Sequence, residues 1–177
     1  MYEEIVAAGF GGQGILRLGK ILAYAAMKEG RQVTYIPSYG AEVRGGTANC
    51  SVVLSDSLIP TPMISAPTAI VIMNNLSYQR FVPGLKNDCL KLINVSLVDT
   101  VSSSSETTLL LPFTELAVKL GNIRVANMIA LAALVKKKEL VALSVLKKSI
   151  NEIFYRVEEE LIDLNLRAID EGVRLVA

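Results

Sequence analysis

The chain has no histidine among its 177 residues, and this absence removes the side chain that most often serves as a general base near neutral pH. Ser-His and Cys-His catalytic pairs are therefore excluded, as are imidazole ligands for a metal. The two cysteines, Cys50 and Cys89, lie far apart, so this chain alone offers no CxxC ligand set for zinc or an iron–sulfur cluster. If the protein takes part in redox chemistry, we expect the redox centre on another chain.

A strong charge of either sign is also missing. The formal net charge is +1, which leaves no general electrostatic field for nucleic acid or an anionic membrane surface. The N-terminus lacks a basic region followed by a long apolar block, so we expect no export and a cytoplasmic protein. Residues 57–79 carry no charge, but Pro60, Pro62 and Pro67 interrupt them and make a membrane-spanning helix a poor interpretation.

The length suits one domain, residues 1–177, and 51% hydrophobic residues without tryptophan predict an aliphatic core. The order of apolar segments predicts a three-layer α/β fold, in which a mostly parallel, Rossmann-like sheet carries helices on both faces. Expected strands at 5–8 and 33–36 are joined by a helix, which predicts a parallel pair with a right-handed crossover. Further strands are expected at residues 50–54, 69–73, 90–95 and 108–111, the last at an edge.

The C-terminal third is predicted to be helical from its apolar periodicity. Helices are expected at residues 113–120, 125–137, 143–155 and 157–171, and Gly172 is expected to end the last of them. The buried face of the final two helices is predicted to consist of Leu146, Ile150, Ile153, Val157, Leu161, Leu164 and Ala168.

The stretch GFGGQG, residues 9–14, follows an apolar strand and precedes a helical pattern. Its four glycines allow close approach to the backbone by a phosphate, a neighbouring loop or another subunit. The spacing matches the GxGxxG dinucleotide fingerprint, but the acidic residue expected at the end of the second strand, which would hold the ribose, is missing. A close-packing turn at an interface is therefore favoured, and a stand-alone dinucleotide-binding protein is the alternative.

A second glycine-containing segment, residues 37–49, follows the second expected strand, where ligands and partners bind in open parallel sheets. Glu42 and Arg44 are separated by one residue, so on an extended segment both side chains project to the same side. As an exposed ion pair they would contribute at most about 1 kcal/mol, but the flanking glycines and Tyr39 favour a binding surface. No catalytic or metal-binding residue is assigned, and the candidate interface or ligand-binding residues are Gly9, Gly11, Gly12, Gln13, Gly14, Ser38, Tyr39, Glu42, Arg44, Gly45, Gly46 and Asn49.

These motifs together resemble the gamma subunit of 2-oxoacid:ferredoxin oxidoreductases, which is a fused domain in single-chain pyruvate:ferredoxin oxidoreductases. The resemblance covers essentially the whole chain. It rests on residues 9–14, on PSYGAEVRGG at 37–46, on Asn122, Asn127 and Met128, and on Asn165, Ala168 and Gly172. The stretch RGGTANC at residues 44–50 is most similar to the 2-oxoglutarate or branched-chain branch of the family rather than to the pyruvate branch.

The resemblance implies a subunit of an oxidoreductase that is inactive alone. The whole enzyme would oxidatively decarboxylate a 2-oxoacid, here 2-oxoglutarate, to an acyl-coenzyme A and reduce ferredoxin. Thiamine diphosphate, magnesium and iron–sulfur clusters are then expected in alpha, beta and ferredoxin-like delta subunits, with no cofactor bound by this chain alone. The segments 9–14 and 38–49 would face the catalytic subunits or coenzyme A, and the isolated chain has the option of a homodimer. A structural α/β domain without any ligand is a third hypothesis.

Overall fold

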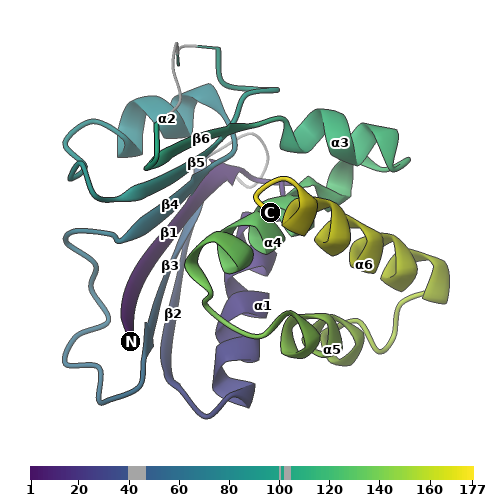
Figure 1. The fold of residues 1–177 in the computed structure, drawn as a ribbon, viewed down its shortest axis with the longest axis horizontal. Coiled ribbons are helices and arrows are strands. Elements are labelled where there is room, and N and C mark those ends of the chain that lie inside the picture. Colours follow the sequence, from purple (N-terminus) through teal and green to yellow (C-terminus); the bar gives the residue numbers. More distant parts are fainter. Residues whose placement is uncertain (40–46, 100, 102–104) are drawn as a thin grey trace.

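The structure, a computed structural model, describes residues 1–39, 47–99, 101 and 105–177. Six strands form one sheet in the order β2-β3-β1-β4-β5-β6 (Figure 1). β1, β4, β5 and β6 pair in parallel, whereas β3 is antiparallel to both of its neighbours. The strands are β1 Tyr2–Phe10, β2 Gln32–Tyr39, β3 Thr47–Ser55, β4 Ala69–Ile72, β5 Leu90–Asn94 and β6 Thr108–Leu111. The predicted α/β fold with a mostly parallel sheet is confirmed.

The predicted direct pairing of β1 with β2 is wrong. The two strands run in the same direction, but β3 lies between them, so that Val52 of β3 faces Ile5 on one side and Tyr35 on the other. Val52, Val53 and Leu54 are buried, whereas no β2 residue from 32 to 38 is buried. The more apolar strand therefore takes the inner position, and β2 becomes an edge of the sheet.

Helices cover both faces of the sheet, as predicted. α2, Asn75–Phe81, packs on one face, and the remaining helices lie on the other (Figure 1). Each face has its own hydrophobic cluster, the larger one beneath α1 and α4. The helices of this larger layer are α1 Ile15–Lys28, α3 Phe113–Lys119, the 3₁₀ turn η1 Ile123–Val125, α4 Ala126–Lys138, α5 Leu143–Ile153 and α6 Glu159–Arg174. Within the described residues, no helix has the length and apolar character needed to cross a membrane.

The last helix does not end at Gly172, as the sequence predicted, but continues to Arg174. Gly172 is buried, and a Cβ atom built on it would lie 2.2 Å from the carbonyl oxygen of Ile129 and 2.8 Å from the Cβ of Ala132. The missing side chain therefore allows α6 to pack closely on α4. Gly172 is thus required by the packing of α6 against α4, and the local sequence around it does not reveal this contact.

The predicted buried face of α5 and α6 divides into two groups. Leu146, Ile150 and Ala168 are fully buried in the main hydrophobic cluster. Ile153, Val157, Leu161 and Leu164 are only partly buried. The helical pattern is therefore correct, but part of the apolar face still meets solvent.

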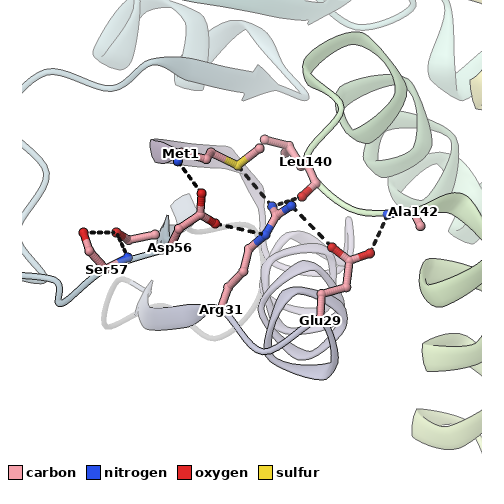
Figure 2. A network of polar contacts seen from close by, with 8 residues as sticks. Met1, Glu29, Arg31, Asp56, Ser57, Leu140 and Ala142 are labelled. Carbon is pink, nitrogen blue, oxygen red and sulfur yellow. Dashed lines mark hydrogen bonds and ion pairs between the residues drawn. The ribbon is translucent and has the colours of Figure 1, made fainter.

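A polar network ties the helical layer to the strand ends opposite the glycine-rich turn (Figure 2). Arg31, just before β2, forms ion pairs with Glu29 at 3.4 Å and with Asp56 at 3.6 Å, and donates to the carbonyl oxygen of Leu140. Glu29 in turn accepts a 2.7 Å hydrogen bond from the backbone nitrogen of Ala142. Arg31 therefore joins the end of α1, the end of β3 and the α4–α5 connection at one point.

Candidate functional site

The glycine-rich turn between β1 and α1 presents bare backbone to solvent. The nitrogen of Gln13 donates to the carbonyl oxygen of Phe10 at 3.1 Å and closes the turn. Gly11 and Gly12 are exposed, and a Cβ atom added at Gly12, where φ is +102°, would meet nothing within 4 Å. Space is thus open beside Gly12 for a ligand or a neighbouring chain.

The other two glycines of the turn are required by close packing inside the molecule. A Cβ atom at Gly9 would lie 2.6 Å from the Oε1 of Gln13, and one at Gly14 would lie 2.2 Å from the Nδ2 of Asn127. Gly14 also has a positive φ of 72°, and its carbonyl oxygen accepts the first hydrogen bond of α1, from Leu18. The motif therefore has two functions, since its ends hold the turn and its middle is exposed.

Gln13 fixes the turn to the neighbouring strand. Its Oε1 accepts hydrogen bonds from the backbone nitrogen of Phe10 at 2.7 Å and from the Nδ2 of Asn74 at 3.0 Å. Its Nε2 donates to the carbonyl oxygen of Met73 at 3.2 Å, immediately after β4. The side chain therefore satisfies polar groups from both strand ends, and we regard Gln13 as a positioning residue for Gly11 and Gly12.

Neutral polar side chains continue this arrangement along the carboxyl ends of the parallel strands. The Nδ2 of Asn94, at the end of β5, donates to the Oγ1 of Thr114 at 2.8 Å and to the Met73 carbonyl at 3.3 Å. On the other side of the turn, the Nδ2 of Asn127 donates to the carbonyl oxygen of Gly14 at 3.0 Å. Because amides and hydroxyls do not titrate near neutral pH, this edge of the sheet holds its geometry without depending on protonation.

A small pocket of about 120 Å³ opens beside the turn. Its lining is mainly apolar, and among the described residues around it the charged one is Arg124, whose side chain is exposed. Two of its apolar side chains, Leu97 and Ile123, are 43% and 58% exposed. We call this cavity the glycine-turn pocket, and it is lined by Gly12, Gln13, Met73, Leu97, Thr114, Ile123, Arg124 and Ala126.

Sequence reasoning did not identify Arg124, Asn74, Asn94 or Thr114 as parts of this site. Arg124 lies between Asn122 and Asn127 of a recognised motif, and that spacing was the available signal. Asn74 follows β4, Asn94 ends β5 and Thr114 follows β6, and the three form no local pattern in the sequence. Only the parallel alignment of β1, β4, β5 and β6 brings them to one edge.

The second predicted segment begins and ends beside the glycine-rich turn. Ser38 of β2 faces Asn49 of β3, and Thr47 of β3 faces Phe10 at the end of β1. Tyr39 is the last residue of β2. Glu42, Arg44, Gly45 and Gly46 lie outside the described residues. The structure thus places both ends of the segment at the edge that carries the turn, while the role of its residues stays a prediction.

Cys50 lies beneath α1 and is not placed to act as a nucleophile. Its thiol donates to the carbonyl oxygen of Ile15 at 3.4 Å, and a Cβ atom on Gly19 would lie 2.4 Å from its sulfur. Burial raises the pKa of Cys50 to about 12, so the thiol stays protonated at neutral pH. We assign it to the packing of α1 against β3.

The fold does not suit the dinucleotide alternative. In a dinucleotide fold the strand that follows the first helix pairs in parallel beside the first strand and carries the acidic ribose ligand. Here the neighbours of β1 are β3 and β4, and β2 ends at Tyr39 without a carboxylate. Among the described residues, no group of three or more Cys, Asp or Glu gathers in a way that could hold a metal ion.

A family model described as pyruvate ferredoxin/flavodoxin oxidoreductase matches residues 4–175. The chain belongs to this family. The ketoisovalerate oxidoreductase subunit VorA of Methanothermobacter thermautotrophicus is 33% identical over 96% of this chain, which spans only 35% of that relative. The 2-oxoglutarate synthase subunit KorC of Methanocaldococcus jannaschii is 33% identical over 97% of this chain and 92% of its own length.

Solved structures agree with this membership. A keto/oxoacid ferredoxin oxidoreductase gamma subunit from Geobacter sulfurreducens PCA is 27% identical, with a TM-score of 0.81 and 98% of both chains covered. The 2-oxoglutarate:ferredoxin oxidoreductase of Magnetococcus marinus, solved with 2-oxoglutarate, coenzyme A and succinyl-CoA, has a TM-score of 0.88 at 25% identity. The match covers 99% of this chain and 31% of the Magnetococcus marinus chain. The resemblance to gamma subunits predicted from the glycine-rich motifs is confirmed.

Proposed function

We propose that this chain is the non-catalytic gamma subunit of a thiamine-diphosphate-dependent 2-oxoacid:ferredoxin oxidoreductase, inactive by itself. The complete cytoplasmic enzyme would convert a 2-oxoacid and coenzyme A to an acyl-coenzyme A and carbon dioxide, and two electrons would pass to ferredoxin. Thiamine diphosphate, magnesium and the iron–sulfur clusters would belong to alpha, beta and delta subunits. This division agrees with a chain that has no histidine and two buried cysteines.

The observation that carries the proposal is the exposed backbone of Gly11 and Gly12 beside the glycine-turn pocket. A bare backbone next to the first turn of α1, which has no side-chain cap at Gly14, is suited to a phosphate or a close neighbouring chain. Arg124 adds a positively charged side chain to the lining of this pocket. Two exposed apolar side chains, Leu97 and Ile123, line the pocket, and exposed apolar groups of this kind are typical of a surface that another subunit covers.

For the 2-oxoacid we propose 2-oxoglutarate. The relative of matching length, KorC, carries that name, and the stretch at residues 44–50 is most similar to that branch. A branched-chain 2-oxoacid is the other candidate, because the VorA relative is equally identical. Initial rates with 2-oxoglutarate, 2-oxoisovalerate and pyruvate, measured on the complete enzyme, decide among them.

The role as a required subunit is tested by reconstitution. The remaining subunits are assayed for 2-oxoacid- and coenzyme A-dependent reduction of a viologen dye, with and without this chain. We expect the rate to depend on the added chain, and the chain alone to give none. Full activity of the remaining subunits without it contradicts the proposal.

The proposed contact with coenzyme A is tested by Arg124→Ala, with Lys20→Ala as the control because Lys20 is exposed on α1 and does not line the pocket. A charge-assisted hydrogen bond contributes about 1.5–3 kcal/mol, so the KM for coenzyme A should rise about tenfold or more in Arg124→Ala. An unchanged KM in both variants removes coenzyme A from this pocket but leaves the subunit role intact. If NAD raises the thermal stability of the free chain, the dinucleotide alternative is favoured.

A further inference from the structure

A second, larger groove lies beside the glycine-turn pocket, between the end of α3 and the first half of α6. Its volume is about 410 Å³. Leu120, Leu161 and Leu164 supply its apolar lining, and Glu158, Glu160 and Asp163 supply acidic groups. We call it the α6 groove, and Figure 1 shows α3 and α6 as neighbours at one end of the helical layer.

The apolar lining of the α6 groove is incompletely packed within this chain. Leu120, Leu161 and Leu164 are each only partly buried. Leu164 and Leu120 pack against the main hydrophobic cluster, but Leu161 is not among the described side chains that do. Since the periodicity of α6 assigns Leu161 to its buried face, its partial exposure indicates a surface suited to an apolar side chain from outside.

The lining of the α6 groove carries an excess of negative charge. Glu158, Glu160 and Asp163 are all exposed, and none of them forms an ion pair with any residue that the structure describes. Arg167 also lines the groove, so the lining keeps an excess of two negative charges, three minus one. The complementary ligand is therefore a segment that combines lysine or arginine with an apolar residue.

The α6 groove is continuous with the surface proposed to meet the catalytic subunits. Gly121 and Asn122 line the groove, and the next two residues, Ile123 and Arg124, line the glycine-turn pocket. Asn122 links the two linings, since its Oδ1 accepts a 3.0 Å hydrogen bond from the backbone nitrogen of Arg124. A chain that covers the pocket can thus extend over residues 121–124 into the groove.

We propose that the α6 groove receives a basic segment with one apolar anchor residue, supplied by the same subunit that covers the glycine-turn pocket. This inference rests on the proposed function, because it takes the other subunits of the oxidoreductase as the source of that segment. The groove would add an electrostatic contact to this interface. Its contribution is greatest at low ionic strength, since exposed charges are screened by salt.

The test compares Glu160→Lys with Glu159→Lys in the full chain. Both glutamates are exposed and adjacent in the first turn of α6, but Glu160 lines the groove and Glu159 does not. Binding to the remaining subunits is measured by titration at low and high salt. We expect Glu160→Lys to raise the Kd about tenfold or more at low salt, with a smaller difference at high salt, and Glu159→Lys to leave the Kd near the wild-type value.

A Leu161→Ser variant tests the apolar anchor without changing charge, and circular dichroism verifies that each variant is folded. Equal effects of the two lysine substitutions, or none from either, overturn the inference. Sedimentation of the free chain tests whether a second copy of this chain occupies the groove. A dimer that Glu160→Lys dissociates would also overturn the inference. Failure of the wild-type chain to bind the remaining subunits would contradict the proposed function itself, so the two failures are distinguishable.

Discussion

The contact between Gly14 and Asn127 allows a quantitative test of why the turn ends in glycine. Replacement by alanine places a methyl group 2.2 Å from the Nδ2 of Asn127 and keeps the backbone at a φ of 72°. The left-handed conformation costs a non-glycine residue about 1–2 kcal/mol. Displacement of Asn127 also breaks its 3.0 Å hydrogen bond to the Gly14 carbonyl, which costs about 1 kcal/mol. We therefore expect Gly14→Ala to lower the free energy of unfolding by about 2–3 kcal/mol.

A matched control separates the two contributions. Gly30 has a φ of +81° and no atom within 4 Å of an added Cβ, so Gly30→Ala reports the backbone cost alone, about 1–2 kcal/mol. In an Asn127→Ala background the new methyl at position 14 faces a Cβ atom at 3.5 Å, an ordinary contact. The cost of Gly14→Ala should then fall to that of Gly30→Ala.

Urea unfolding followed by circular dichroism measures all of these variants, with wild type and Asn127→Ala alone as references. Gly14→Ala and Asn127→Ala should be clearly non-additive, because both act on one contact. Additive losses, or a Gly14→Ala variant no less stable than Gly30→Ala, would refute the reasoning. Close packing would then not be the reason for glycine at this end of the turn.

Three further variants examine packing and polar burial. Gly172→Ala should destabilise by about 1–2 kcal/mol in urea, because the crowding of its Cβ against the Ile129 carbonyl outweighs the gain in helix propensity; a stabilised variant would show that the helices separate freely. Arg31→Ala should lose about 1–3 kcal/mol, since the Leu140 carbonyl loses its donor, and a change below about 0.5 kcal/mol would place it with ordinary surface substitutions. Burial raises the pKa of Cys50 from 9.0 to about 12. The buried, protonated Cys50 thiol therefore makes its full contribution to the free energy of unfolding below pH 9, and this contribution is lost as pH rises toward 12. The unfolding free energy of wild type should fall more steeply over that window than that of Cys50→Ala, and parallel curves would contradict the assignment.

The type and order of the elements were largely predictable from local pattern. The strand at residues 5–8 and the helices at 113–120 and 125–137 follow from runs of apolar residues and from the spacing of glycines, which act over a few neighbouring positions. Pairing was less predictable. The hairpin of β2 with β3 depends on which strand buries more apolar surface at the centre of the sheet, and this is a competition between segments rather than a property of either one.

The features of the candidate site also fall into those that the sequence predicts and those that only the fold reveals. The sequence by itself determined the family and the glycine-rich turn between the first strand and the first helix, because these depend on residue identity and short spacing. Only the tertiary structure decided that Gln13, Asn94 and Asn127 support this turn, that Arg124 stands beside it, and that Gly172 is a packing residue. Hydrogen bonds and close contacts between segments far apart in the chain form only when parallel strands and crossing helices bring those segments together, and no local pattern encodes that meeting.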